Sequence, residues 1–218
     1  MADFFGVLTD NWSIFRTGFV TTIELFVISA IGALILGTAL GAMRVSPVPP
    51  LRAFGATYVN IVRNTPLTLV FAFMVFAAPK LQIILDYFPT ACVALTAYTS
   101  AFVCEVIRSG VNTVPTGQAE AARALGLTFG QTLRTVVLPQ AVRSIVPPLM
   151  SVVIALLKNT TIAAGFSVLE AGAIPAYLSE RSVSQFPVLV WITIGFLILI
   201  VPLAVLQRHL ERRWAVLR

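Results

Sequence analysis

Charged residues are scarce in this 218-residue sequence, and their scarcity limits the class of protein. Lys, Arg, Asp and Glu together make up 11% of the chain, whereas 58% is hydrophobic and the mean hydropathy is +0.92. A soluble domain is about a quarter charged, so these residues are too few to cover a surface that faces water. We therefore expect a polytopic membrane protein rather than a soluble protein with a very large core.

Residues that carry chemistry are also few. His209 is the single histidine, and no cluster of cysteines or carboxylates accompanies it, which argues against a metal site. The sequence has no nucleophile elbow and no plausible catalytic triad, so we expect no catalytic residue and disfavour a membrane enzyme. Lysine occurs only in PKL and LKN, whereas a phosphate-binding loop needs Gly-Lys-Ser or Gly-Lys-Thr. The chain therefore binds no cofactor of its own, and any use of ATP must come from a partner.

Five segments are long and apolar enough to cross a bilayer, which takes about 20 mostly apolar residues. They cover residues 18–43, 54–78, 89–107, 145–168 and 186–206. No repeat and no linker divides the sequence, so we expect a single all-α transmembrane domain over 1–218. The main alternative is a secondary transporter or channel that works without partners. Inverted repeats would be expected there, and five crossings cannot divide into equal halves.

The positions of the basic residues predict the orientation in the membrane. No basic cluster with interleaved aromatics is present, so the net charge of +6 does not indicate a nucleic-acid partner. If the N-terminus is outside, ten arginines fall on the inner face and three basic residues on the outer face, which satisfies the positive-inside rule. The inner residues are Arg44, Arg52, Arg108, Arg123, Arg134, Arg143, Arg208, Arg212, Arg213 and Arg218, and the outer residues are Arg16, Lys80 and Arg181. The loop over 111–143 is then cytoplasmic, as is the C-terminus.

A polar stretch within this loop predicts two short helices. Thr116 can cap the first helix, and Gly126 suits its C-terminal stop. Thr128 and Gln131 fit a capping box for the second helix, which we expect to end before Pro139.

The first of these helices lies in GQAEAARALG (117–126) and is covered by alanines. Small side chains let another backbone approach closely, so this helix is suited to a groove on a partner. The alternative is an ordinary polar loop with an ion pair between Glu120 and Arg123 at spacing i, i+3.

The polar stretch resembles the EAA loop in the membrane subunits of bacterial ABC importers. That pattern is EAA, three residues, Gly, nine residues, an aliphatic residue, one residue and Leu-Pro. The matching residues are Glu120, Ala121, Ala122, Gly126, Val136, Leu138 and Pro139. Only Val136 departs mildly, since Ile is commoner there. The resemblance implies a coupling helix, with Gly117 and Gln118 in its first turn, that sits in a groove of a cytoplasmic ATPase subunit; Glu120 would contact the ATPase and Gly126 would permit the turn.

Three further motifs resemble the polar amino acid permeases of the histidine, glutamine and glutamate group, most closely the actinobacterial glutamate uptake permeases. IVRNTPL (61–67) is similar to FRGTPL, with Asn64 in place of Gly, and KNTTIA (158–163) is similar to KNTSLA. AYTSAFVCEVIRSGVNTVPTGQAEAARALG (97–126) is similar to the third helix and loop of that group, with Ser109 where a second Gly is frequent.

This resemblance implies the transmembrane domain of a type I ABC importer in a bacterial cell membrane, with five crossings and an outside N-terminus. It implies a second permease subunit, identical or homologous, two cytoplasmic ATPase subunits that bind ATP and Mg, and an extracellular substrate-binding protein. The implied substrate is a polar amino acid of the glutamate, glutamine or aspartate type.

Two cations fall inside predicted spans, Arg63 in 54–78 and Lys158 in 145–168. Ionisable residues inside a bilayer are costly and usually face a protein interior or a pathway. We therefore identify a candidate substrate path suited to a carboxylate. Its residues are Arg63, Asn64, Thr65, Lys158, Asn159, Thr160 and Thr161. The alternative is structural, with these side chains capping carbonyls or bonding polar neighbours.

Other polar and small residues within the spans have simpler explanations. Glu105 and Arg108 share a helix face at spacing i, i+3, which predicts a local ion pair. Gly32, Gly37 and Gly41 predict close helix packing along the first span.

Overall fold

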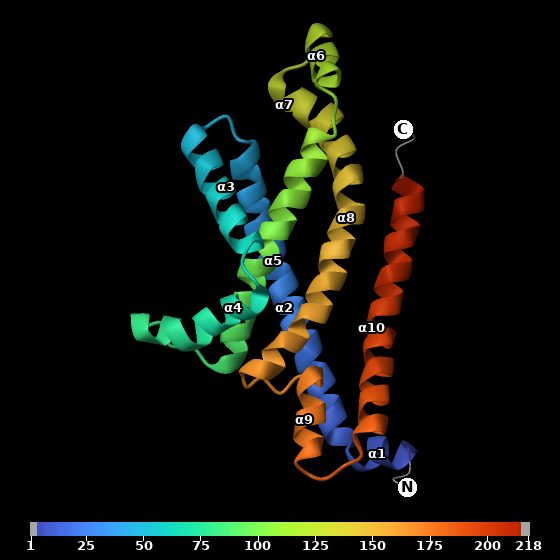
Figure 1. The fold of residues 1–218 in the computed structure, drawn as a ribbon. Coiled ribbons are helices and arrows are strands. Elements are labelled where there is room, and N and C mark those ends of the chain that lie inside the picture. The colour runs from blue at the N-terminus through green and yellow to red at the C-terminus, as the bar shows by residue number, and fades with distance from the viewer. Residues whose placement is uncertain (1–3, 215–218) are drawn as a thin grey trace.

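The computed structural model describes residues 4–214, and every regular element in that range is helical (Figure 1). In chain order the elements are α1 (Phe4–Asp10), α2 (Trp12–Val45), α3 (Pro49–Arg63), α4 (Leu67–Ala72), the π-helical turn η1 (Phe73–Ala77), the 3-10 turn η2 (Ala78–Leu81), α5 (Tyr87–Asn112), α6 (Thr116–Ala124), α7 (Phe129–Thr132), the π-helical turn η3 (Leu133–Val137), α8 (Leu138–Asn159), the 3-10 segments η4 (Thr160–Phe166) and η5 (Ala171–Ala173), α9 (Ile174–Ser179) and α10 (Gln185–Trp214). The all-α fold predicted from composition is confirmed.

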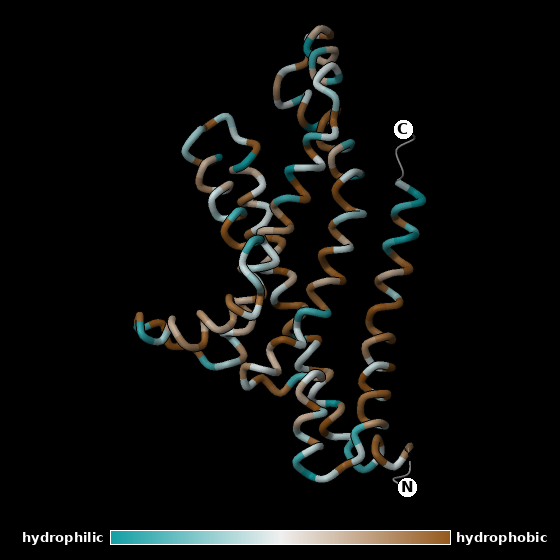
Figure 2. The backbone as a smooth tube through the Cα atoms, viewed as in Figure 1, coloured by the Kyte–Doolittle hydropathy of each residue, from teal (hydrophilic) through white to brown (hydrophobic). Residues whose placement is uncertain are grey.

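Four helical stretches within the described residues are long and apolar enough to cross a membrane. They are α2, α5, the run Phe129–Phe166 that contains α8, and α10. A fifth span results if α3 and the following run Leu67–Leu81 are counted as one. In Figure 2 α10 is mostly brown (apolar) along its length and turns teal (polar) toward its C-terminal end, as expected for a helix that leaves the membrane there.

The boundaries of the spans differ from those predicted. α2, α5 and α10 each begin before and end after the predicted segments 18–43, 89–107 and 186–206. A helix satisfies its own backbone hydrogen bonds, so it can continue through residues too polar to be counted as membrane-spanning. α8, by contrast, gives way to η4 at Thr160, before the predicted end at 168.

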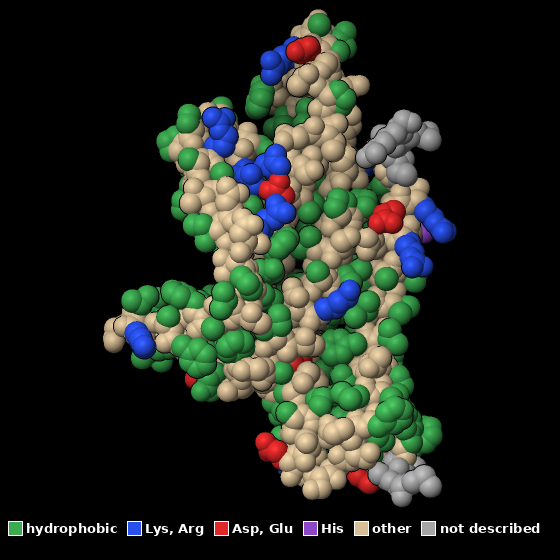
Figure 3. Space-filling model, viewed as in Figure 1, with side chains coloured by type: hydrophobic (Ala, Val, Ile, Leu, Met, Phe, Trp, Pro, Cys, Tyr) green, Lys and Arg blue, Asp and Glu red, His purple; other side chains and the backbone are tan. Residues whose placement is uncertain are grey.

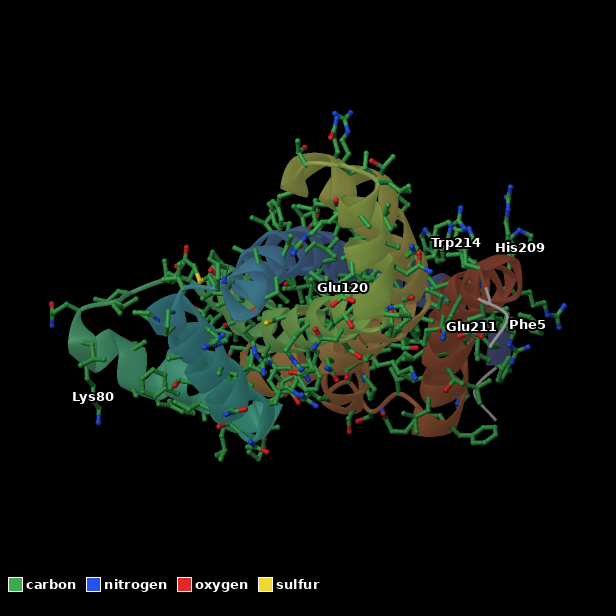
Figure 4. All side chains as sticks on the ribbon, turned by 90° about the horizontal axis from the view of Figure 1, so that it is seen from above. Phe5, Lys80, Glu120, His209, Glu211 and Trp214 are labelled. Carbon is green, nitrogen blue, oxygen red and sulfur yellow. The ribbon has the colours of Figure 1, made fainter. Side chains whose placement is uncertain are left out.

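The predicted second span, 54–78, is not one straight helix. α3 ends at Arg63, and the chain bends by 102° before the next helix begins at Leu67. Pro66 explains this correction, because it has no amide hydrogen for the helical ladder and disfavours helical geometry in the residue before it. Figure 1 shows the resulting arm, made of α4, η1 and η2, projecting sideways from the bundle, and Figure 4 places Lys80 near the arm's outer end.

Glycines bring α2 close against α5, as predicted. A Cβ atom added at Gly37 would lie 2.8 Å from the carbonyl oxygen of Ser100. A Cβ at Gly41 would lie 2.9 Å from the side chain of Ile107, and Gly32 faces α5 in the same way. The packing role of the three glycines is confirmed, since any side chain there would push the two helices apart.

The second predicted loop helix does not end before Pro139, which corrects that expectation. α7, η3 and α8 follow one another without a gap. In the wider π-helical turn the Leu138 amide donates to the Leu133 carbonyl, and Pro139 then lies in the first turn of α8, where proline is tolerated. The loop is therefore joined to the membrane-spanning helix by continuous helical structure.

The two ends of the bundle differ in composition. α1 and α9 lie at the end where the chain begins, whereas α6 and α7 lie at the opposite end, toward which α10 runs (Figure 1). In Figure 3 most of the Lys and Arg side chains on the face shown lie toward the α6 end. This asymmetry agrees with the uneven distribution of basic residues in the sequence.

Candidate functional site

The first of the two predicted loop helices is present as α6, which ends as the sequence indicates. Gly126 has a φ of +82°, a backbone conformation that favours glycine, and its amide donates to the Arg123 carbonyl over 2.9 Å. The start of α6 differs from the prediction. Thr116 is the first helical residue rather than the cap, and Pro115 occupies the cap position with no side-chain hydrogen bond.

α6 presents most of its surface to solvent. Glu120 and Ala121 are exposed, whereas Ala122 is only 4% exposed and faces its own chain. The exposed surface of α6 therefore excludes Ala122, although this residue belongs to the matched motif. Just beyond the helix the side chains of Leu125 and Phe129 are 83% and 71% exposed, so two large apolar groups extend this surface.

The alternative of a self-contained ion pair in this loop is wrong. Among residues 4–214 every salt bridge involves Glu105, so Glu120 is not paired with Arg123. Figure 4, which looks down on the α6 end, shows Glu120 over the middle of the molecule, far from Lys80 on the arm. The Glu120 carboxylate is therefore available to another molecule.

The remaining motif residues lie where α7 leads into α8. The predicted capping box is confirmed, because the Gln131 amide donates to the Thr128 hydroxyl and the Gln131 side chain accepts from the Thr128 amide. Leu138 and Pro139 are exposed at the start of α8. Gly117 and Gln118 are exposed in the first turn of α6, so this whole segment offers an accessible face.

A second candidate region lies around Glu105 on α5. Its carboxylate pairs with Arg108 on the same helix, as predicted, and also with Arg44 on α2. The Arg63 guanidinium at the end of α3 lies 3.4 Å from the same carboxylate. One anion therefore faces three cations, and the group keeps a surplus positive charge.

Arg63 connects this charged group to a cavity between α5 and α8. Its guanidinium carbon lies 5.5 Å from the centre of the Phe102 ring, a distance suited to a cation–π contact. Phe102 is one of the residues around a cavity of about 290 Å³. The cavity is lined by Tyr98, Thr99, Phe102, Ser151, Val152 and Ala155.

The second cation of the predicted path, Lys158, lies on the same helix as one wall of this cavity. It follows Ala155 by three residues on α8 and is exposed. Residues at this spacing lie on neighbouring positions of one helix face. The two cations therefore lie on two sides of the cavity, Arg63 beside Phe102 of α5 and Lys158 on α8.

Four polar residues of the predicted path bond to their own helices. The Asn64 amide donates to the Asn60 carbonyl, and the Thr65 hydroxyl donates to the Ile61 carbonyl over 2.8 Å. These bonds satisfy carbonyls left free where α3 ends at the bend. At the corresponding end of α8, the hydroxyls of Thr160 and Thr161 donate to carbonyls three residues earlier, and Thr160 is fully buried. Asn159 is half-buried.

Sequence reasoning missed the aromatic and hydroxyl lining of the cavity. Tyr98 and Phe102 precede Glu105 by seven and three residues, and Ser151 precedes Lys158 by seven. Residues three or seven positions apart lie on the same helix face. The lining of the cavity could therefore have been predicted by following the face of Glu105 along α5 and the face of Lys158 along α8. No group of three or more His, Cys, Asp or Glu placed to hold a metal ion occurs in residues 4–214.

Sequence comparison identifies the family. Residues 32–216 match the family described as binding-protein-dependent transport system inner membrane component. The chain belongs to this family. It is a membrane component of a transport system, which confirms the class predicted from its composition and motifs.

Two relatives cover almost the whole permease. It is 44% identical over 211 residues to the glutamate transport system permease protein GluC of Corynebacterium glutamicum, covering 91% of this chain and 92% of GluC. It is 36% identical over 207 residues to the probable glutamine ABC transporter permease protein GlnM of Bacillus subtilis, covering 95% and 96%. These similarities agree with the resemblance seen in the motifs.

The fold of the permease matches a solved transporter. The structure described as an amino acid ABC transporter with histidines superposes with a TM-score of 0.90 at 25% sequence identity, covering 98% of this chain and 99% of that one. The permease therefore has the fold of a type I ABC importer transmembrane subunit.

Proposed function

We propose that the permease imports a polar amino acid of the glutamate, glutamine or aspartate type, using ATP hydrolysed by partner subunits. The observation that carries this proposal is the exposed face of α6 around Glu120, which forms no salt bridge within residues 4–214. A short turn joins α6 to α7, and from α7 the helical structure continues into α8, which forms one wall of the cavity. The names of GluC and GlnM support the choice of substrate class.

We propose an assembly of two permease subunits, identical or homologous, with two ATPase subunits on the α6 end and a substrate-binding protein at the opposite end. The N-terminus would be outside and the C-terminus cytoplasmic. The concentration of Lys and Arg toward the α6 end supports this orientation, because basic residues favour the cytoplasmic side. ATP and Mg would be bound by the ATPase subunits alone.

The substrate would pass the cavity between α5 and α8. The surplus positive charge around Glu105 and the exposed Lys158 would attract a carboxylate. Asn64, Thr65, Thr160 and Thr161 would hold the ends of the broken helices, since their side chains already bond to carbonyls there. Asn159 would complete the polar rim.

The decisive experiment reverses the charge of Glu120. The complex with its ATPase and binding-protein partners, carrying Glu120→Lys, is reconstituted in liposomes, and ATP hydrolysis and amino acid uptake are measured together. We expect uptake per ATP hydrolysed to fall at least about tenfold, because the reversed charge damages a contact with the ATPase. Glu211→Lys, at an exposed site on α10 outside the loop that carries α6, is the matched control. Normal coupling in Glu120→Lys would refute the assignment of α6.

The orientation has its own test. A cysteine at Gln118 should react only with a membrane-permeant reagent in intact cells, whereas one at Glu180 should react with an impermeant reagent. Cys92 and Cys104 are buried and give little background. Reaction of the Gln118 position with the impermeant reagent would reverse the topology.

The alternative of a transporter that works alone is tested in the same liposomes. Uptake by the permease without its ATPase partners would favour that alternative. The substrate is identified by measuring which amino acids raise the ATPase rate of the full complex.

A further inference from the structure

An apolar groove lies at the α1 end of the bundle, far from α6. It has a volume of about 310 Å³ and runs between the first turns of α2 and the first half of α10. Gly195 helps to form it, because the Phe19 ring occupies the place that a side chain on Gly195 would take; a Cβ there would lie 2.1 Å from the ring. Ile23 and Ile198 continue the walls along the two helices.

The other end of the groove is closed by α1. The indole N–H of Trp191 on α10 donates to the carbonyl of Phe4 over 2.9 Å, and the rings of the two residues are 5.1 Å apart. Leu8 of α1 also lines the groove. The groove is therefore a slot between α2 and α10 with α1 across its end.

One cation lies on this otherwise apolar slot. Arg16 is exposed, and no acid within the described residues forms a salt bridge with it, since all such bridges involve Glu105. Trp12 lies one turn earlier on α2 and is 58% exposed. Arg and Trp together are typical of the boundary between lipid headgroups and hydrocarbon.

The depth of Arg16 agrees with that boundary. α2 has 34 residues and is about 51 Å long, whereas the hydrocarbon core of a bilayer is about 30 Å thick. The second turn of such a helix lies at headgroup level. Phe19 and Ile23, one and two turns further along, then lie at the depth of the acyl chains.

We propose that this groove binds one anionic glycerophospholipid. Its headgroup phosphate pairs with Arg16, and one acyl chain lies in the slot between Phe19, Ile23 and Ile198. An amino acid does not fit this chemistry, because the slot offers no carboxylate for the ammonium group. The acyl chain of a zwitterionic lipid fills the slot equally well. Its headgroup pairs less favourably with Arg16, because that headgroup also carries a positive charge.

The test locates lipids on the complete transporter complex in nanodiscs. The discs contain a trace of phosphatidylglycerol or of phosphatidylcholine, each with a photoreactive group on one acyl chain, and the cross-linked peptides are identified by mass spectrometry. We expect phosphatidylglycerol to label residues 15–23 and 194–199 about fivefold more than phosphatidylcholine, the preference that one arginine gives at an anionic headgroup.

Three variants separate the contribution of the Arg16 charge from that of the apolar slot. Arg16→Gln should bring the ratio of the two lipids close to one. Ile198→Trp, at an exposed position that does not disturb the core, should fill the slot and lower labelling by both lipids. Arg181→Gln is the control, because this arginine stacks on Tyr177 near α9, outside the groove, and the ratio should stay at its wild-type value.

Several outcomes would overturn the proposal. Equal labelling by the two lipids in the wild type would remove the role of Arg16. Equal loss of preference in Arg16→Gln and Arg181→Gln would show a general effect of surface charge. Absence of lipid labelling in the groove would mean that another subunit covers it.

Discussion

The hydroxyl of Thr22 on α2 lies 3.0 Å from Oε2 of Glu170, which ties the first spanning helix to the loop before α9. Both side chains are fully buried. The Thr22 oxygen also accepts the Ala171 amide and lies 3.0 Å from the Gly18 carbonyl. A hydroxyl has only one proton, so all these contacts are satisfied together when Glu170 is neutral and donates to Thr22.

We expect the stability of the complex to depend on the protonation of Glu170. Burial raises the pKa of this carboxyl and outweighs the hydrogen bonds that would lower it. Because the folded pKa lies above the unfolded one, the stabilisation is complete below the unfolded pKa and is lost as pH rises through the folded pKa. The unfolding temperature should therefore fall as pH rises above the ordinary titration range of a glutamate carboxyl.

Glu170→Gln tests this relationship, because glutamine keeps the shape of the neutral carboxyl and cannot ionise. The variant should unfold at a temperature that depends less on pH than that of the wild type. Thermal unfolding of the purified complex across the pH range provides the measurement. Glu180→Gln, at an exposed position on the same end, should keep the wild-type slope. Equal slopes for wild type and Glu170→Gln would show that Glu170 is already ionised.

Gly37→Ala should destabilise the contact between α2 and α5. The new methyl group would lie 2.5 Å from Cβ of Val103 and 2.8 Å from the Ser100 carbonyl oxygen, so the helices must separate. Overpacking of this kind costs about 1–3 kcal/mol and should appear as a lower unfolding temperature. Gly130→Ala is the matched control, because no atom lies within 4 Å of its added Cβ. A similar fall in unfolding temperature in both variants would mean that close packing of α2 against α5 is not the cause.

Gly126→Ala should loosen the end of α6 without unfolding the bundle. The position has a φ of +82° and open space around it, so the cost comes from the backbone conformation alone, about 1 kcal/mol. Hydrogen exchange at the Leu127 amide, which donates to the Ala122 carbonyl, should become faster. Gly126→Asn should show a smaller effect, since asparagine tolerates this conformation better. Unchanged exchange in the alanine variant would contradict the role of Gly126.

Arg63→Gln and Lys158→Gln should weaken the apparent affinity for substrate. Loss of one charged contact to a carboxylate costs about 1.5–3 kcal/mol, so half-maximal uptake should require at least about tenfold more substrate in one or both variants. Assembly should persist in Arg63→Gln, because Glu105 keeps its bridges to Arg44 and Arg108. Arg52→Gln, at an exposed position near the start of α3, is the control. A normal apparent affinity for substrate in both variants would show that the substrate carboxylate does not bind beside Arg63 or Lys158.

The sequence was sufficient for features that depend on neighbouring residues. Hydropathy predicted four of the five spanning segments as single helical stretches. The stop at Gly126 and the capping box of Thr128 follow from local hydrogen bonding. The ion pair of Glu105 with Arg108 follows from helical spacing. Each of these is decided within a few residues of the chain.

Features that depend on distant parts of the chain could not be predicted. Pro66 can kink a helix or end it, and the 102° bend depends on how the following arm packs. The burial of Glu170 needs Thr22, which lies 148 positions away. Pro139 predicts an interruption, but the π-helical turn before it accommodates the missing amide, and that turn has no clear signal in the sequence.

The unbroken run from Phe129 to Phe166 has a mechanical consequence. It contains 38 residues, so it is about 57 Å long. A tilt of about 5° at one end moves the other by roughly 5 Å, close to one helical turn. Lys158 lies 29 residues beyond Phe129, about 44 Å along the run, so a tilt of this size about Phe129 displaces it by roughly 4 Å. A movement at the loop can therefore reach the candidate substrate path without local unfolding of the helix between them.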